Sequence, residues 1–354
     1  MFGFSTYNTR GDMADPTWSN QTERVFTLKD FRFGSGETLP ELRQNVITFG
    51  NPRKNAAGEV TNAVLLIHNT TGTASSWLLP ELADNLFGPG RPLDASRYFL
   101  VAPDMIGFGR SSKPSDGLRA RFPHYRYADM VVAQHRLLTE HLGIQHLHLV
   151  LGLSMGGMLT WMFGETFPDF MDALVPVASQ PGPMSGRNWI QRRINIDAIR
   201  SDPEWSNGDY ENNPTRWALT APIGALMTQS VVRIQEMAPT REAGDALYKQ
   251  FVERAKKGDA NNRLYQLEAS MDYDPSGELH KIKARVLAIN FADDELNPPA
   301  LGVLEPAIAR IPGALCVTVP AGPQTLGHYT TMRSAIWKDH LAAFLDSMTM
   351  ARPK

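Results

Sequence analysis

The sequence lacks the features that identify several large classes of protein. It contains one cysteine, Cys316, so no disulfide can form within the chain. Its nine histidines are scattered, without a His/Cys cluster at metal-ligand spacing, and its formal net charge is only −2. No stretch approaches the roughly 18 apolar residues of a membrane-spanning helix. We therefore expect no metal site, and neither nucleic acid nor a membrane as a partner.

Recognisable secretion signals are also absent. The segment MFGFSTYNTRGDMADP (1–16) has no basic region followed by an apolar one, so it does not resemble a signal peptide. The lack of paired cysteines fits a reducing compartment, and we expect a cytoplasmic protein. Cys316 lies in the apolar run ALCVTVP, where we expect it to pack rather than to react.

The sequence does contain enough apolar residues for the core of one large α/β domain. Of its 354 residues, 42% are hydrophobic, which is enough for a sizeable core. Short apolar runs alternate with helical patterns such as residues 127–142, where apolar residues recur at spacings of three and four. Residues 25–33 alternate between apolar and polar positions, which predicts an antiparallel edge strand. Seven near-continuous apolar runs predict buried strands at 45–50, 63–68, 98–103, 146–153, 173–179, 285–291 and 314–320.

These elements predict a mostly parallel, eight-stranded sheet with helices on both faces. Residues 180–280 interrupt the alternation, because they contain no convincing strand and are rich in Trp, Met, Arg, Asn and Pro. Helices are predicted there near 187–201, 214–235 and 241–257. We therefore expect three segments, namely a first part of the core at 1–179, a helical cap insertion at 180–280 and a second part of the core at 281–354.

A serine lies where one predicted strand turns into a helix. The strand at 146–153 runs into Gly152-Leu153-Ser154-Met155-Gly156, a G-x-S-x-G pattern that is weak evidence by itself. The strand before it and the helical pattern after it form the strand–turn–helix of a nucleophile elbow, in which glycines let the two elements close on a sharp turn. Ser154 would then lie at the carboxyl edge of the sheet, where open α/β folds bind ligands. This predicts Ser154 as a catalytic nucleophile.

A serine nucleophile needs a base and an orienting acid. With a nucleophile elbow, the acid follows Ser in the chain and the histidine follows the acid. His328, in the loop PQTLGHYTTM after the last predicted strand, fits the role of base. The segment AINFADDELNPP after the penultimate strand offers Asp293, Asp294 and Glu295 as the acid. We favour Asp294, with Asp293 as the alternate.

The oxyanion formed during attack on an acyl carbon needs two backbone donors. One is expected to be the N–H of Met155, directly after the nucleophile. The second is expected in the loop HNTTGTASSW (68–77), where we favour Thr70 and keep Asn69 and Thr71 as alternatives.

Two neighbouring features receive structural interpretations. His68 ends a predicted strand, and we expect it to support the following loop rather than to act as a second base. The glycine-rich turn PDMIGFGRSS (103–112) has no lysine-bearing phosphate motif, so we interpret it as a tight loop. No cofactor is expected.

Together these features resemble the α/β-hydrolase fold and, within it, the homoserine O-acetyltransferase family, whose members transfer an acetyl group from acetyl-CoA through an acyl-serine. The resemblance covers most of the predicted core and part of the insertion. The similar segments in the insertion are the more specific ones, because any α/β hydrolase would carry the nucleophile elbow. It implies a triad of Ser154, Asp294 and His328. The similar sequence segments are HNTTG (68–72), GLSMGGM (152–158), AIRSDPEWSNGDY (198–210), DANNRLYQLEASMDYD (259–274), DELNPP (294–299) and GHYTTM (327–332).

Two positions depart from the family's pattern. The family carries an acid directly after the catalytic histidine, implicated in holding the homoserine amine, whereas this chain has Tyr329. The family also carries an F-G-R segment before the segment that begins D-A-N, and the arginine of F-G-R contacts the substrate carboxylate. No F-G-R segment occurs between 228 and 258 in this chain. Arg233, Arg241 and Arg254 are candidate substitutes for that arginine, or else solvated helix charges.

We therefore expect a serine hydrolase that acts on small, short-acyl carboxylic esters through an acyl-serine. The alternative is an O-acyltransferase of the homoserine O-acetyltransferase type that uses acetyl-CoA. A non-catalytic, ligand-binding α/β-hydrolase fold is a more distant alternative. The expected partner is a small-molecule ester, and a homodimer is left open. The pocket is expected to be lined by Tyr329 and by cap residues, with Met184, Trp189, Trp205 and Trp217 as candidates.

Overall fold

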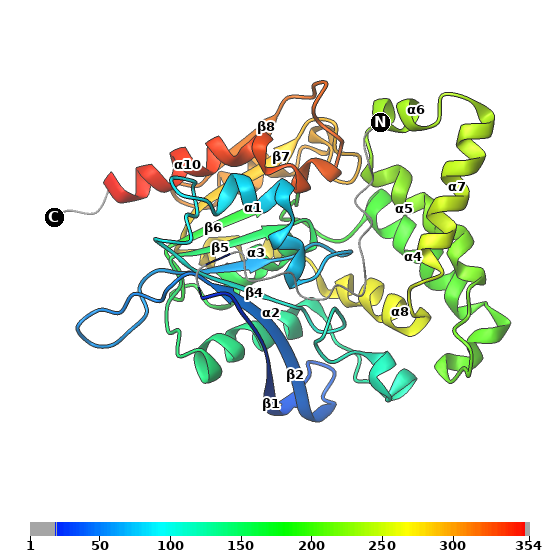
Figure 1. Ribbon diagram of the computed structural model, residues 1–354, viewed down its shortest axis with the longest axis horizontal. Helices are drawn as coiled ribbons and strands as arrows, with labels where there is room; N and C mark the ends of the chain where they lie inside the picture. Colours follow the sequence, from blue (N-terminus) through cyan, green and yellow to red (C-terminus); the bar gives the residue numbers. More distant parts are fainter. Residues whose placement is uncertain (1–17, 19, 351–354) are drawn as a thin grey trace.

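An eight-stranded sheet forms the centre of the molecule (Figure 1). The computed structural model describes Trp18 and residues 20–350, so the expectation about residues 1–16 lies outside the described residues. All eight predicted strands are present, at β1 Thr22–Arg32, β2 Thr38–Phe49, β3 Ala63–Ile67, β4 Phe99–Pro103, β5 Leu149–Leu153, β6 Ala173–Val177, β7 Arg285–Phe291 and β8 Leu315–Val319.

The sheet is mostly parallel, as predicted. Its strand order is β1-β2-β4-β3-β5-β6-β7-β8. The pairs β1–β2 and β2–β4 are antiparallel, and every other neighbouring pair is parallel. The alternating run at 25–33 thus belongs to an antiparallel strand at the edge of the sheet. Because β3, β5, β7 and β8 are parallel, the loops that follow them all emerge at the same edge.

Helices cover both faces of the sheet. On one face, α1 (Pro80–Leu86) packs against α10 (Ser334–Met350), and buried side chains of both belong to one apolar cluster with the strands. A second apolar cluster covers the other face with α2 (Tyr127–Arg136), α3 (Met155–Thr166) and α9 (Leu304–Ile308). This arrangement is that of the α/β-hydrolase fold predicted from the sequence.

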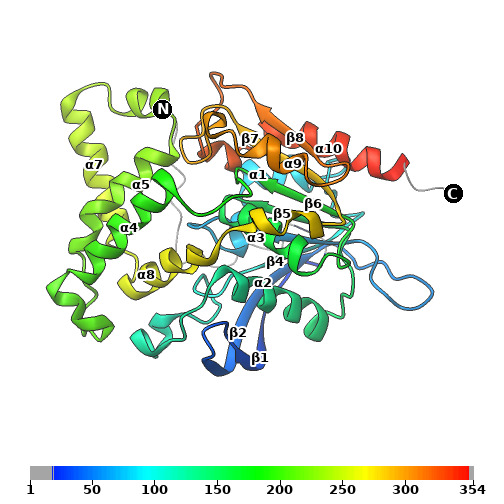
Figure 2. The same ribbon diagram turned by 180° about the vertical axis from the view of Figure 1, so that it is seen from behind.

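The chain between β6 and β7 is helical. Its longer helices gather beside the sheet in both ribbon views, and α7 lies farther from the sheet than α4 and α8 (Figures 1 and 2). The second apolar cluster continues from α2 and α3 into this region, so the two parts share one core. The helices are α4 Gly186–Arg200, α5 Ala221–Thr228, α6 Val231–Met237, α7 Arg241–Ala255 and α8 Ala260–Glu268, with short 3-10 turns such as Arg216–Thr220 between them.

Two details of this region differ from the sequence-based expectations. The single helix predicted at 214–235 is broken, because Ser230 adopts an extended conformation and its side chain caps α6 by accepting the N–H of Arg233. The helix α8 was not predicted. It starts at Asp259, whose side chain accepts the N–H of Asn262, and this N-cap marks the start of a helix in a stretch with few apolar positions.

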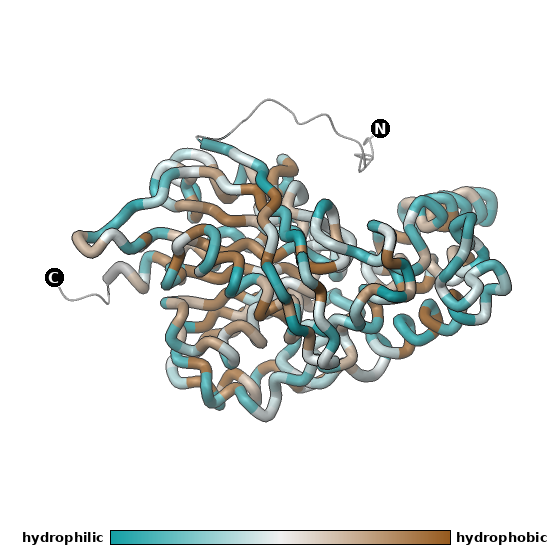
Figure 3. The backbone as a smooth tube through the Cα atoms, turned by 90° about the horizontal axis from the view of Figure 1, so that it is seen from below, coloured by the Kyte–Doolittle hydropathy of each residue, from teal (hydrophilic) through white to brown (hydrophobic). Residues whose placement is uncertain are grey.

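Hydrophobicity differs between the two parts of the molecule. The backbone tube is brown through the central strands, whereas the outer helices of the helical region are mostly pale or teal (Figure 3). Within residues 20–350, no helix combines the length and the apolar character that a membrane crossing requires.

Candidate active site

Ser154 occupies a sharp turn between β5 and α3. Its backbone has φ 55° and ψ −112°, a conformation that a residue with a side chain rarely adopts. The flanking glycines explain how the turn closes: a Cβ at Gly152 would clash with the carbonyl of Gly156, and a Cβ at Gly156 would clash with the carbonyl of Ile67. The local geometry is therefore that of a nucleophile elbow, and it places the serine hydroxyl at the carboxyl end of the strand.

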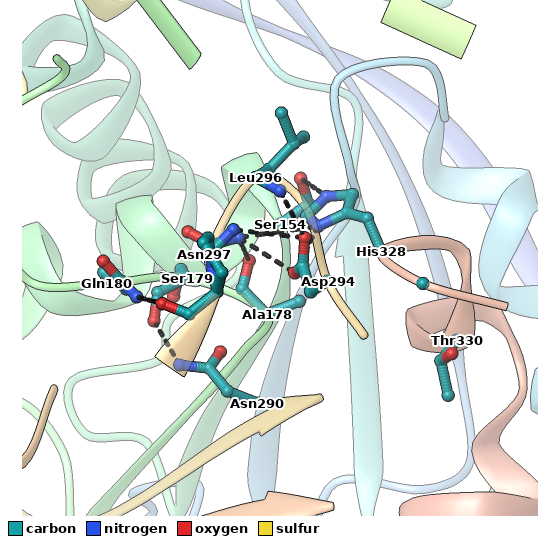
Figure 4. Close-up of polar contacts among 12 residues, drawn as sticks. Ser154, Ala178, Ser179, Gln180, Asn290, Asp294, Leu296, Asn297, His328 and Thr330 are labelled. Carbon is teal, nitrogen blue, oxygen red and sulfur yellow. Dashed lines mark hydrogen bonds and ion pairs between the residues drawn. The ribbon is translucent and has the colours of Figure 1, made fainter. Parts of the chain in front are cut away.

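The structure brings the three predicted triad residues into one hydrogen-bonded row (Figure 4). The hydroxyl of Ser154 donates to Nε2 of His328 at 2.6 Å, and Nδ1 of His328 donates to Oδ2 of Asp294 at 2.7 Å. Ser154 follows β5, Asp294 follows β7 and His328 lies in the loop after β8, so three separate parallel strands deliver the row. A neutral imidazole at this position can accept the serine proton, which makes the hydroxyl a nucleophile.

The carboxylate of Asp294 is almost fully buried, with 1% of the residue exposed. Burial raises the pKa of this carboxyl, but the charge of His328 and the hydrogen bonds from His328, Asn297 and Leu296 outweigh burial, so its pKa lies below the ordinary value. Leu296 N–H donates at 2.8 Å and Asn297 N–H at 3.1 Å to Oδ1, while the Asn297 side chain donates at 3.1 Å to Oδ2. The acid is thus held ionised and in a fixed orientation.

The two neighbouring acids have other partners. Oδ2 of Asp293 accepts the hydroxyl of Thr325 at 2.8 Å and the N–H of Gly327 at 2.9 Å. It therefore fastens the loop that carries His328. Glu295 forms an exposed ion pair with Arg187 of α4. Of the three candidate acids, Asp294 is the one that contacts the histidine.

Asn297 is a site residue that the sequence analysis does not single out. Its side-chain amide donates to Oδ2 of Asp294 and, at 3.0 Å, to the carbonyl of Ala178 at the end of β6. The same nitrogen lies 3.5 Å from Nδ1 of His328. Asn297 thus ties the acid loop to the neighbouring strand end. Its sequence signals are its place three residues after the favoured acid and its inclusion in the family-like segment DELNPP (294–299).

The loop after β3 lies beside the elbow, because a Cβ at Gly156 would clash with the carbonyl of Ile67. The N–H of Thr71 donates to Oδ1 of Asn69 at 3.1 Å and is not free for an oxyanion. Among the described residues, the N–H groups of Asn69 and Thr70 have no hydrogen-bond acceptor. The N–H of Met155, the first of α3, has no partner within the helix. These geometries favour Thr70 or Asn69 over Thr71 as the second donor.

His68 supports this loop. One ring nitrogen, Nδ1, donates to the carbonyl of Asn69 at 2.8 Å, and Nε2 accepts the N–H of Met105 at 3.1 Å. Burial lowers the pKa of His68, although the nearby Asp104 opposes the shift. The buried Asp104 in turn accepts the N–H of Ala74 at 2.7 Å and that of Arg110 at 2.8 Å, so it joins the two loops after β3 and β4.

The helical region contacts the loops that carry His328 and Asp294. The N–H of Ser230 donates to the carbonyl of Leu326 at 3.2 Å, two residues before His328. Arg187 at the start of α4 pairs with Glu295, next to Asp294. A Cβ at Gly327 would lie 2.8 Å from the Ser230 nitrogen, so this contact is close.

The expected pocket residues have different surroundings. Met184, Trp189 and Trp205 are half-buried against the shared apolar cluster, and the indole of Trp205 donates to Asn261 at 2.8 Å. Trp217 is buried, and its indole donates to the carbonyl of Pro214 at 2.8 Å, which is a packing role inside the helical region. Tyr329 follows His328 directly and packs partly against the cluster of α1 and α10.

Two of the three candidate arginines form surface ion pairs. Arg233 pairs with Glu236 at 3.1 Å, and the exposed Arg241 pairs with Glu242 at 3.2 Å. These contacts match the interpretation as solvated helix charges. Within residues 20–350, no group of three or more His, Cys, Asp or Glu side chains is arranged to hold a metal ion.

Comparison with known proteins places this geometry in a family. A family model described as the alpha/beta hydrolase fold matches residues 62–324. A probable acyltransferase of Methanothermobacter thermautotrophicus is 29% identical over 298 residues, which cover 82% of this chain and 88% of that protein. A homoserine O-acetyltransferase of Pelobacter propionicus is 33% identical over 318 residues, which cover 78% of this chain and 83% of that protein.

Solved structures include both an esterase and a transferase of the same fold. The acetyl esterase MekB superimposes with a TM-score of 0.77 at 25% identity, covering 92% of this chain and 97% of the esterase. The homoserine O-acetyltransferase of Bacillus anthracis superimposes with a TM-score of 0.79 at 20% identity, covering 92% of this chain and 98% of that chain, and shows the shared fold. The chain therefore belongs to the α/β-hydrolase fold family and, within it, to the homoserine O-acetyltransferase-like group.

Proposed function

We propose that this protein is an acyl-serine enzyme that takes an acyl group from a small ester or thioester onto Ser154. The observation that carries the proposal is the continuous row from Ser154 through His328 to Asp294, with hydrogen bonds of 2.6 and 2.7 Å. His328 accepts the serine proton as the oxygen attacks the acyl carbon, and the Asp294 carboxylate stabilises the imidazolium that forms. The N–H groups of Met155 and Thr70 hold the oxyanion.

The second half of the reaction uses the same residues in reverse. Acylation ends when His328 gives the serine proton to the leaving group, which departs. In the second half His328 accepts a proton from the incoming acceptor, which attacks the acyl-serine, and returns that proton to Oγ of Ser154 as the acyl–serine bond breaks. An alcohol acceptor makes the enzyme an O-acyltransferase, and water makes it an ester hydrolase. The helical region at 180–280 acts in both cases as a cap, since its contacts at Ser230 and Arg187 join it to the loops of the base and the acid.

Transfer to an alcohol, of the homoserine O-acetyltransferase type with acetyl-CoA as donor, is the first candidate. The names of the curated relatives support it, because an acyltransferase and a homoserine O-acetyltransferase match most of the chain. The names of the relatives thus favour the O-acyltransferase, which the sequence analysis gave as the alternative to a serine hydrolase.

Hydrolysis of a short-acyl ester is the second candidate, supported by one residue. Tyr329 stands where the family carries an acid, and a neutral phenol offers an ammonium group only a hydrogen bond. Charge-assisted hydrogen bonds are about twice as strong as neutral ones, so an amino-acid acceptor is held less well here. The similarity to an acetyl esterase points the same way.

Competition between acceptors tests the two candidates. Purified protein is given acetyl-CoA with and without millimolar homoserine, and separately p-nitrophenyl acetate, and products are identified by mass spectrometry. Transfer predicts that O-acetylhomoserine forms faster than free acetate. Hydrolysis predicts acetate release from p-nitrophenyl acetate without CoA, unchanged by homoserine. A protein that does neither, and is not labelled by a fluorophosphonate, contradicts the acyl-serine proposal.

A further inference from the structure

His68 is a buried histidine outside the triad, and both of its ring nitrogens contact backbone groups. It is the residue after β3, and only 1% of it is exposed. Its Nε2 lies 3.1 Å from the backbone nitrogen of Met105, which can only donate, so Nε2 accepts and carries no proton. The proton of the neutral ring is then on Nδ1, which donates to the carbonyl of Asn69 at 2.8 Å. These contacts select one tautomer of His68.

The surroundings of the ring favour its neutral form. Burial lowers the pKa of His68, and this effect outweighs that of the nearby Asp104 carboxylate. The carboxylate of Asp104 is itself buried and accepts the N–H groups of Ala74 and Arg110. A proton on Nε2 would face the N–H of Met105, so that two donors would oppose each other. His68 is therefore a fixed donor at Nδ1 and a fixed acceptor at Nε2.

The carbonyl of Asn69 belongs to the peptide that carries the N–H of Thr70. A peptide unit is planar, and no peptide bond among the described residues is cis, so this carbonyl and this N–H point in opposite directions. The carbonyl also accepts the N–H of Gly72 at 3.1 Å, besides the ring N–H of His68. Because both donors hold the carbonyl on one side, the N–H of Thr70 points to the other side.

The residues around this peptide contact both ends of the catalytic row. The elbow approaches the start of the loop, since a Cβ at Gly156 would lie 2.9 Å from the carbonyl of His68. The side-chain nitrogen of Asn69 donates to the sulfur of Met332 at 3.3 Å, in the turn that follows His328. The N–H of Thr70 has no acceptor in the part of the chain that the structure describes. An N–H group without a partner beside the nucleophile is what a developing oxyanion requires.

The same peptide geometry separates Thr70 from Asn69, the other candidate donor. The N–H of Asn69 shares its peptide with the carbonyl of His68, and that carbonyl faces Gly156 of the elbow. The N–H of Asn69 therefore points away from Gly156. The next peptide has the reverse arrangement, because its carbonyl is turned toward the ring of His68. Of the two N–H groups, that of Thr70 is the one left to face the reacting carbon.

We propose that His68 is a positioning residue that sets the direction of the peptide between Asn69 and Thr70 and thereby aims the N–H of Thr70 at the oxyanion. The ring holds the carbonyl of Asn69 away from the nucleophile. Without the donor at Nδ1, the peptide can rotate and present its carbonyl oxygen where the oxyanion forms, and that oxygen repels negative charge. The inference rests on the proposed acyl-serine chemistry and adds to it the residue that builds one half of the oxyanion hole.

Two amide side chains at position 68 separate the two bonds of the ring. In His68→Asn, the amide nitrogen takes the place of Nδ1 and keeps the bond to the carbonyl of Asn69, while the bond from Met105 is lost. In His68→Gln, the longer side chain brings an amide oxygen to the place of Nε2, which keeps the bond from Met105 and loses the donor to Asn69. Only His68→Asn thus keeps the bond that the proposal requires.

The rate at which a fluorophosphonate labels Ser154 compares the variants, because the phosphoryl oxygen occupies the oxyanion hole during attack. His68→Gln should be labelled about 100- to 1,000-fold more slowly than the unmodified chain, the usual effect of losing one oxyanion donor. His68→Asn should stay within about tenfold, as expected for the loss of one hydrogen bond elsewhere. With an ester substrate, kcat should fall in the same order and KM should change little, since the oxyanion exists only after attack.

Thermal unfolding checks that stability does not explain the difference. Each variant loses one buried hydrogen bond, so both should have a similar Tm, below that of the unmodified chain. His148→Gln is the control, because His148 precedes β5 at the opposite edge of the sheet and should not affect labelling. Equal labelling rates for the two variants at position 68, or faster labelling of His68→Gln, overturns the proposal. An unmodified chain that is not labelled at all contradicts the acyl-serine chemistry itself, which is a different result.

A measurement on the unmodified chain applies even if neither variant folds. Nitrogen-15 NMR distinguishes protonated from unprotonated ring nitrogens, and the contact of His68 with the ring of Phe108, at 5.0 Å between centroids, identifies its signals. We expect Nδ1 to be protonated and Nε2 to be unprotonated near neutral pH. A proton on Nε2, alone or together with one on Nδ1, overturns the proposal.

Discussion

Two regions meet at the carboxyl edge of the sheet, and they treat buried charge in opposite ways. On the sheet side, the carboxylate of Asp294 receives hydrogen bonds from His328, Asn297 and the backbone of Leu296. On the helical side, Arg192 keeps a buried Nη1 without a described partner. A buried charge with a full set of hydrogen bonds is held in one orientation, whereas a buried charge with an incomplete set lowers the stability of the fold.

The comparison extends to how the two regions hold their side chains. The elbow and its loops are joined by short hydrogen bonds between strand ends, which position the triad before any substrate is present. The helical region exposes large apolar side chains, including Val231 at 72% and Leu226 at 54%. The sheet side thus holds its side chains in fixed positions, whereas the helical side leaves large apolar side chains in contact with solvent.

Removal of the nucleophile should have the largest effect. Ser154→Ala is expected to lower kcat by about a millionfold, because the acyl-serine can no longer form. A fluorophosphonate should label the unmodified chain at Ser154 alone, as read by peptide mass spectrometry. The exposed Ser201→Ala variant is the control and should keep full activity. Near-normal turnover by a clean Ser154→Ala sample would remove the basis of the mechanism.

Separate replacement of Asp293 and Asp294 should show that the two adjacent acids have different roles. Asp294→Asn is expected to lower kcat by about ten-thousandfold, because an amide can neither orient the imidazole correctly nor stabilise the imidazolium. Asp293→Asn should cost about tenfold or less, since its remaining carbonyl oxygen can still accept the bonds from Thr325 and Gly327. Steady-state kinetics on one ester compares them. A larger loss in Asp293→Asn would transfer the role of acid to Asp293.

A smaller effect is expected from Glu165, a partly buried carboxyl near the end of α3. Burial, and then the charge of Glu278, raises the pKa of Glu165 to about 7, and one of its oxygens is buried without a described partner. The folded state therefore keeps this proton where the unfolded state has lost it, and stability falls as pH rises from about 4.5 to about 7. Glu165→Gln should stabilise the protein at pH 8 by about 1 kcal/mol, discounted for partial exposure to solvent.

Urea unfolding at pH 5 and pH 8 measures this effect, and the gain from Glu165→Gln should be larger at pH 8. Glu140→Gln is the control, because Arg136 lowers the pKa of Glu140 and the shift has the opposite sign. A gain for Glu165→Gln that does not grow with pH would show that Glu165 is already ionised in the folded state.

The sheet and the triad could be predicted from the sequence because each has a local signature. Strands such as β3 and β5 are continuous apolar runs, and Ser154 lies between glycines at a strand end. The sequence favoured Asp294 and kept Asp293 as the alternate, since the two differ by one position. The structure shows that Asp294 contacts His328 and that Asp293 accepts the N–H of Gly327 instead.

Residues whose role depends on contacts distant in the chain could not be predicted. Arg192 occurs in a helix among other charged residues, and nothing local distinguishes it from arginines near the surface such as Arg233 and Arg241. Arg192 is buried on α4, a helix that packs against α8, and this packing is not visible in the sequence. Asn297 can tie the loop of Asp294 to the sheet only because the carboxyl end of β6 lies beside it, where its side chain donates to the carbonyl of Ala178.

The turn at Ser154 shows that folding and selection favour different residues at one position. With φ at 55° and ψ at −112°, the backbone of Ser154 lies where glycine is comfortable and serine is not. A sequence chosen for stability alone would place glycine at 154, beside the glycines already at 152 and 156. The serine at 154 therefore costs stability, as is expected of a residue that serves chemistry rather than folding.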